Sequence, residues 1–217
     1  DTNSSFAQER ESDDFTYEVY DTYIKITGCN STESVVTIPE TIDGKPVTVL
    51  GEDSFYQKTE MTEIHLPSGI ETIEKGAFYR CYALTSIPIP ETVTRIDTDV
   101  FFRCSSFQNI TVDTENSNYC DIDGVLFNKN KTELIAYPEG KAETQYTLPN
   151  SVTKIDDSAF GYKTNLKIIG IPSSVTELPD YNIFVYSDEI ILRVAPDSIA
   201  ETYAKEYNIS YETDEAL

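Results

Sequence analysis

Hydrophobic positions recur along this chain with a fixed period of 23 residues. Ile64, Pro67, Ile73, Phe78 and Cys81 each have a counterpart 23 residues later. These counterparts are Ile87, Pro90, Ile96, Phe101 and Cys104. A period in the twenties with apolar residues at fixed offsets predicts a solenoid, in which each repeat forms one coil of a stack.

The period extends beyond these two repeats and is interrupted at two places. Ile110 continues the column of Ile64 and Ile87, and positions 149, 155 and 160 repeat at 172, 178 and 183. Five extra residues around Asp43-Gly44 lengthen the first coil, where the Asp-Gly step predicts a turn. The longer spacing between residues 101 and 160 leaves room for an insertion at about 113–133, which we expect to project from the stack as a hairpin.

Each repeat has the residue pattern of a short strand followed by a turn. Ile64 and Leu66 alternate with Glu63 and His65, so the two apolar side chains face the core and the polar ones face outward. Pro67 lacks a backbone N–H and ends the strand. A helical or 3₁₀ turn around Phe78 then closes the coil, which predicts a right-handed, β-rich coil of short parallel strands.

The pattern predicts a single domain over residues 15–211. Alternating residues in 15–34 indicate a capping hairpin, 35–189 carry the repeats, and 190–211 form a C-terminal cap. Residues 199–207 have apolar positions at helical spacing, with Asp197 or Ser198 as the N-cap. Residues 1–14, which are acidic, and 212–217 have no apolar pattern, so we expect flexible tails.

The repeats resemble the BspA-like leucine-rich repeats. The string Leu84-Thr85-Ser86-Ile87-Pro88-Ile89-Pro90, continued by Phe101 and Cys104, carries the resemblance, as do Val36-Thr37-Ile38-Pro39 and Ile122-Asp123-Gly124-Val125-Leu126-Phe127. Val100 and Ile183 depart from the usual Ala and Phe. The resemblance implies a leucine-rich-repeat solenoid in a secreted or surface-displayed bacterial protein, and adhesion to host proteins or other cells is implicated for several members.

Composition narrows the range of partners. The 16 basic and 38 acidic residues give a net charge of −22, which disfavours nucleic acid and anionic lipid. The sequence lacks a run of 18 apolar residues, so we expect no membrane insertion. Asp1 opens a polar stretch without the apolar segment of a signal peptide, which we expect to have been removed from an extracellular or cell-surface protein.

The residues that could support chemistry have simpler structural explanations. Cys81 and Cys104 occupy one position in successive coils, so we expect buried thiols there, with a disulfide as the alternative. His65 is the single histidine and lacks a nucleophile motif around it, so we predict no catalytic site. No metal site or cofactor is expected either, because the acidic residues of the insertion lack the order of a calcium loop.

Two surface columns are candidate binding sites. The first consists of outward positions on the strands of the repeats and is small, neutral and mixed in character: Glu63, His65, Ser86, Asn109, Thr111, Gln145 and Thr147. The second is a column of aromatic residues next to the core phenylalanines, here called the aromatic ladder: Tyr56, Tyr79, Phe102 and Phe184. The ladder could instead stabilise the stack through contacts between its rings.

These features predict a non-enzymatic, monomeric recognition module that binds a host or bacterial surface protein, or a glycan, through the repeated sheet face. One alternative is a spacer without a ligand of its own. Another is a β-helix enzyme that cleaves acidic polysaccharide, which would need a column of clustered basic residues.

Overall fold

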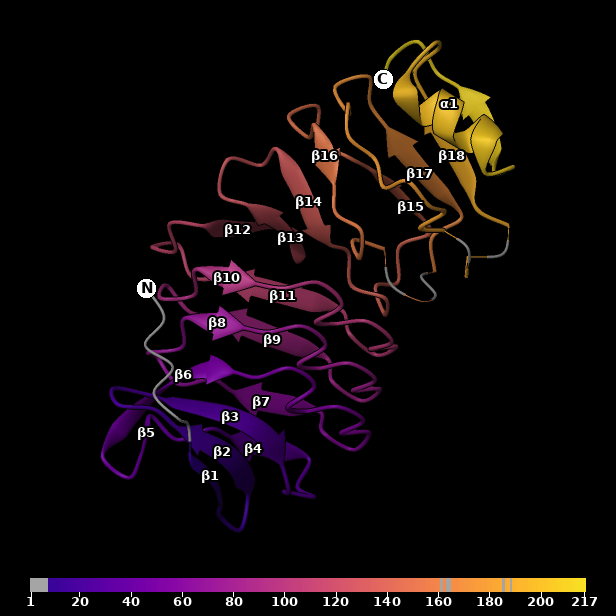
Figure 1. Cartoon of the computed structure of the whole chain (residues 1–217). Coiled ribbons are helices and arrows are strands. Elements are labelled where there is room, and N and C mark those ends of the chain that lie inside the picture. Colours follow the sequence, from indigo (N-terminus) through magenta and orange to yellow (C-terminus); the bar gives the residue numbers. More distant parts are fainter. Residues whose placement is uncertain (1–7, 161, 163–164, 185, 188) are drawn as a thin grey trace.

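The computed structural model describes residues 8–160, 162, 165–184, 186–187 and 189–217, and its coils stack in chain order (Figure 1). Most coils contribute one strand to the front side of the stack and one to its rear side. The front strands form three separate sheets and are β4 (Val35–Thr37), β7 (Glu63–His65), β9 (Ser86–Ile89), β11 (Asn109–Val112), β15 (Gln145–Thr147), β17 (Ile168–Ile171), β18 (Ile191–Val194) and β19 (Ser210–Thr213). The rear strands are β3 (Ile24–Cys29), β6 (Lys45–Leu50), β8 (Thr72–Ile73), β10 (Arg95–Ile96), β14 (Glu133–Ala136) and β16 (Lys154–Ile155).

Strand register confirms the period read from the sequence. On the front side β11 pairs in parallel with β9 through Ile110 and Ile87, and in another sheet β18 pairs with β17 through Leu192 and Ile169. Both offsets are 23 residues. The chain therefore belongs to the predicted class of β-rich solenoids with short parallel strands.

The third side of each coil, here called the turn side, consists of turns with hydrogen bonds from residue i+3 to residue i. Tyr79 N donates to Gly76 O at 2.8 Å, and Cys81 N donates to Phe78 O at 3.1 Å. These are single 3₁₀-type turns. Phe55, Phe78 and Phe101 stack beneath them as a buried core column, with ring centroids 5.3 and 6.0 Å apart.

Backbone hydrogen bonds join the turns of successive coils. Phe55 N donates to Ala77 O at 2.8 Å, Phe78 N to Val100 O at 3.0 Å, and Arg80 N to Phe102 O at 3.0 Å. Each turn thus satisfies its donors with carbonyl groups of the next coil, which a single isolated coil could not do.

The stack bends at the insertion, where the strands change direction (Figure 1). The insertion contains β12 (Tyr119–Ile122) and β13 (Val125–Asn128), which pair antiparallel. β13 also pairs antiparallel with β14. Our expectation of a projecting hairpin is wrong, because Val125, Leu126 and Phe127 are fully buried. The insertion lies between two hydrophobic clusters, and Leu126 packs into the first while Val125 and Phe127 pack into the second.

The N-terminal residues are more ordered than the sequence predicts. Residues 8–11 were expected in a loose tail but form β1 (Gln8–Glu11), which pairs antiparallel with β2 (Phe15–Val19). β2 pairs with β3, and a short strand β5 (Thr41–Ile42) pairs with β6. All four β1 side chains are exposed, so no hydrophobic alternation marks this strand in the sequence. Residues 1–7 lie outside the described residues.

A helix and one more strand close the other end. The predicted C-terminal helix is confirmed as α1 (Ile199–Glu206), and the Ser198 side chain caps it by accepting a hydrogen bond from Glu201 N. The expected tail at 212–217 is wrong, because β19 pairs with β18 as far as Thr213, and Leu217 O accepts hydrogen bonds from Ser173 N and Oγ. Backbone pairing orders this segment although its side chains are exposed.

Candidate functional site

The front face bears the first group of predicted site residues. Glu63, His65, Asn109 and Thr111 are exposed on β7 and β11, and Ser86 is half-buried on β9 between them. Alternate residues of these strands point into the core, so the residues between them point outward. The outward side chains of β4, β7, β9 and β11 together form one surface, here called the front face.

Local contacts hold several of these side chains. Glu63 Oε1 lies 3.2 Å from His65 Nε2, and Asn109 Nδ2 donates to Thr111 Oγ1 at 3.0 Å. Glu63 is the only carboxylate on the outward positions of β4, β7, β9 and β11. The face is therefore nearly neutral in a chain of net charge −22.

Gln145 and Thr147 do not continue this surface directly. They are exposed on β15, which pairs with β17 in a sheet separate from β9 and β11. The turn at Gly124 lies against β11 instead, where Ile110 N donates to Gly124 O at 3.1 Å. The predicted column of seven residues is therefore divided into two groups by the insertion, a break that the period alone does not reveal.

The aromatic ladder exists in part. Tyr56 and Tyr79 stack at 5.5 Å with an interplanar angle of 8°, and Tyr79 and Phe102 stack at 5.6 Å and 9°. Phe184 was assigned to the ladder wrongly, because it is buried and packs on Phe160 of the core at 5.2 Å. The coil that ends there is one residue longer than the period, which moves Phe184 into the core column.

Stacking restricts what the ladder can bind. Both faces of the Tyr79 ring are covered by neighbouring rings, so its edge alone remains for a ligand. Tyr162 and Tyr186 extend the ladder by meeting Phe102 edge-on, at 6.3 Å and 73° and at 6.4 Å and 70°. A sugar needs an open ring face for stacking, so the ladder itself primarily stabilises the turn side.

The ladder borders a shallow groove of about 580 Å³. Glu52, Asp53, Lys75, Gly76 and Asp99 line its other side. Gly76 has φ +64°, and a Cβ atom there would lie 2.3 Å from Asp53 Oδ1. Glycine is therefore needed at this position both for the backbone conformation and for the space.

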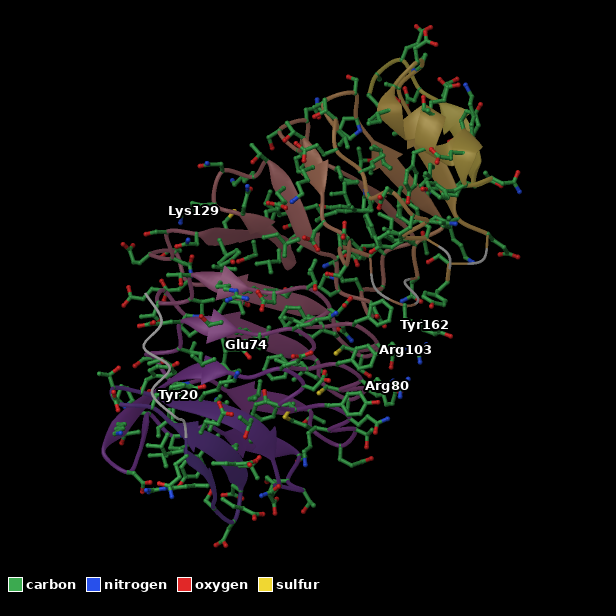
Figure 2. The ribbon with its side chains drawn as sticks, viewed as in Figure 1. Tyr20, Glu74, Arg80, Arg103, Lys129 and Tyr162 are labelled. Atoms are coloured by element: carbon green, nitrogen blue, oxygen red, sulfur yellow. The ribbon has the colours of Figure 1, made fainter. Side chains whose placement is uncertain are left out.

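Two arginines that do not line this groove adjoin the ladder. Arg80 and Arg103 follow Tyr79 and Phe102 in their coils, and both have positive φ, 63° and 62°. Figure 2 shows Arg80, Arg103 and Tyr162 one above another along the same edge of the molecule. The sequence led us to expect no column of basic residues, and the 23-residue spacing of Arg80 and Arg103 is the signal that indicates this short one.

Glu139 joins the two halves of the stack. It is 5% exposed, and its Oε1 accepts hydrogen bonds from Arg103 N at 2.7 Å and from Tyr162 N at 2.6 Å. Burial raises the pKa of this carboxyl to about 7, although both hydrogen bonds and the Arg103 charge act in the opposite direction. A side-chain carboxylate here replaces the backbone carbonyl that a regular next coil would supply.

A family comparison agrees with this architecture. The BspA type leucine rich repeat region, in six copies, matches residues 26–144 and 136–208. The chain belongs to the BspA-type leucine-rich repeat family. No curated protein matches it in sequence.

Several solved structures are similar to this BspA-type chain. A leucine rich cell surface protein from Faecalibacterium prausnitzii A2-165 is 20% identical with a TM-score of 0.47, over 86% of this chain and 76% of that one. The pneumococcal vaccine antigen PcpA is 15% identical with a TM-score of 0.49, over 86% and 72%. A leucine-rich repeat protein from Eubacterium ventriosum ATCC 27560 is 19% identical with a TM-score of 0.44, over 86% and 71%.

The cysteines of this BspA-type chain are free thiols. Cys81 and Cys104 are fully buried, and their Sγ atoms donate to Phe55 O and Phe78 O of the preceding coils, each at 3.1 Å. Burial raises the pKa of Cys81 to about 12 and that of Cys104 well above its usual range. The interpretation as structural thiols therefore holds, and the disulfide alternative does not.

Acidic residues of the insertion serve local structure. Asp113 Oδ1 accepts a hydrogen bond from Glu115 N at 2.9 Å, and Asp121 Oδ1 accepts one from Val112 N at 2.8 Å. Within the described ranges there is no cluster of three His, Cys, Asp or Glu side chains arranged to hold a metal ion. None of the helices in this part of the chain is long and apolar enough to cross a membrane.

Proposed function

We propose that this BspA-type chain is a non-enzymatic, monomeric recognition module of a bacterial surface or secreted protein. Its front face binds a protein or glycan partner. The supporting observation is the nearly neutral, exposed surface of β4, β7, β9 and β11, which stands out in a chain of net charge −22.

The rigidity of this surface favours binding. Ile64, Ile87 and Ile110 are buried beneath it, and parallel pairing fixes the strands, so the outward side chains lose little further backbone entropy on association. Val35, at 46% exposure, adds an apolar contact at one end of the face. Mixed polar and apolar character without dense charge is common at protein interfaces.

The test is binding of the chain to an array of extracellular matrix proteins and neutral mucin-type glycans at physiological salt. His65→Lys combined with Thr111→Lys should abolish any saturable binding, because both changes put long charged side chains on the front face. Thr94→Lys with Thr202→Lys is the matched control on exposed positions elsewhere. Equal loss in both double variants, or binding that survives the front-face changes, would refute the proposal, and a blank array with folded protein would favour a spacer.

A further inference from the structure

Two of the five arginines form no ion pair with another described residue, although the chain has 38 acidic residues. Among the residues that the structure describes, the guanidinium groups of Arg80 and Arg103 form no ion pair, although the buried Glu139 carboxylate accepts a hydrogen bond from the backbone N–H of Arg103 and feels its charge. The other three arginines form ion pairs: Arg10 with Asp43 at 2.7 Å, Arg95 with Asp97 at 2.7 Å, and Arg193 with Glu212 at 2.9 Å.

Aromatic rings hold both unpaired guanidinium groups in place. Arg80 Cζ lies 5.3 Å from the ring centroid of Tyr79, and Arg80 Nη1 donates to Tyr56 Oη at 3.1 Å. Arg103 Cζ lies 3.9 Å above the ring of Tyr162. These contacts reduce the side-chain entropy that binding an anion would otherwise cost.

The two arginines repeat with the step of the solenoid. They occupy equivalent positions in adjacent coils, with the same backbone conformation, and Arg80 N donates to Phe102 O of the next coil. Neighbouring coils are spaced by about 4.8 Å, the distance between paired strands. Figure 2 shows both labelled side chains at the edge of the molecule, where both residues are half-buried and the Nε atom of each is buried without a hydrogen-bond partner.

We propose that Arg80 and Arg103 form a binding site for the carboxylate of an acidic sugar, such as a uronic acid residue in a glycan. The guanidinium group presents paired N–H donors that match the two oxygens of a carboxylate. Tyr82, two residues after Arg80, is 39% exposed and stacks on no other ring in the described part of the chain, so it is the nearby aromatic residue that we assign to contact with the sugar ring.

Charge favours a sugar over an acidic protein as the ligand. A protein segment rich in Asp or Glu would bring many negative charges toward a chain of net charge −22. In a uronic acid glycan each sugar ring carries a single carboxylate, so a short oligomer brings few charges, and two of its carboxylates can each meet a guanidinium group. This site is on the turn side and does not depend on the front face, so either proposal can fail without the other.

The experiment is a titration of the whole chain with tetragalacturonate at physiological salt. Arginine Nε–Hε signals of the ¹⁵N-labelled protein report on each site, and the signals of Arg80 and Arg103 should shift saturably while those of the three paired arginines do not. Arg80→Gln with Arg103→Gln should weaken binding roughly 10- to 100-fold, the range for losing charge-assisted hydrogen bonds. Arg10→Gln with Arg95→Gln makes the same change in net charge and should leave the affinity unchanged.

Four results would overturn the proposal. The first two are the absence of saturable shifts at Arg80 and Arg103, and an affinity of the Arg80→Gln, Arg103→Gln variant for tetragalacturonate equal to that of the unsubstituted protein. The other two are an affinity for the methyl-esterified tetramer equal to that for tetragalacturonate, and binding of hexaglutamate as tight as that of tetragalacturonate or tighter. The methyl ester removes the charge but keeps the sugar, and hexaglutamate tests the acidic-protein alternative. Because the shifts are read on the unsubstituted protein, a variant that fails to fold does not remove the test.

Discussion

Glu139→Gln is expected to stabilise this protein at neutral and alkaline pH and to remove a pH dependence of its unfolding. The carboxylate is buried at the joint between the two hydrophobic clusters, where a single oxygen accepts hydrogen bonds from Arg103 N and Tyr162 N. Glutamine keeps a carbonyl oxygen for both N–H groups but carries no charge. The substitution thus separates the role of the acceptor from the cost of a buried negative charge.

The size of the effect follows from the pKa of Glu139, which burial raises from 4.5 to about 7. The folded protein holds this proton more tightly than the unfolded chain, so the stabilisation from protonation is complete below pH 4.5. It is lost as the pH rises through about 7. The difference of about 2.5 pH units corresponds to roughly 3 kcal/mol of unfolding free energy between the two limits.

Urea unfolding between pH 4.5 and 8, followed by circular dichroism, measures this difference. The free energy of unfolding of Glu139→Gln relative to the unsubstituted protein should rise with pH by roughly 3 kcal/mol, whatever constant offset the amide introduces. Glu91→Gln removes an exposed carboxylate and should show no such trend. A Glu139→Gln difference that stays constant across this pH range would refute the argument that the charge at the joint is destabilising.

Three further predictions concern the turn side. Tyr79→Ala should lower the free energy of unfolding by roughly 1–3 kcal/mol in urea titrations, because it removes the ring that stacks on both of its neighbours. Gly76→Ala should cost roughly 1–3 kcal/mol in the same assay, since its Cβ would meet Asp53 and its φ is positive, and retained stability would contradict the role given to this glycine. Cys81 and Cys104 should resist Ellman's reagent at pH 8 until the chain is unfolded, and fast reaction in the native state would contradict their burial.

The repeated part of the fold follows from the sequence because each coil repeats the environment of the one before it. Ile87 is buried for the same reason as Ile64 and Ile110, so an apolar position at a fixed offset is sufficient evidence for its place in the core. The side-chain directions of the front face follow from the same alternation. The strands and the core columns of the regular coils can therefore be predicted from the sequence pattern alone.

The errors occur where the period changes or where backbone pairing acts without a side-chain pattern. Phe184 was misplaced because one extra residue precedes it, and a shift of one position exchanges a core column for its neighbour. β1 and β19 have only exposed side chains, so hydrophobicity does not mark them. The insertion was expected outside the stack because its sequence pattern is that of a hairpin. The pattern does not show that Leu126 packs into the first hydrophobic cluster and that Val125 and Phe127 pack into the second.

The joint between the clusters depends on side-chain acceptors more than the regular turns do. Between regular coils, backbone carbonyls accept most of the hydrogen bonds that join the turns, and Glu52 N, which donates to Glu74 Oε2 at 3.0 Å, is an exception. At the joint, the Ser158 hydroxyl accepts from Asp99 N at 3.1 Å, and the Glu139 carboxylate accepts from residues on both sides. The contact between the two halves at this point therefore depends on the identity of Ser158 and Glu139 and on the protonation of Glu139, so a substitution or a change of pH here acts on the coupling of the two halves.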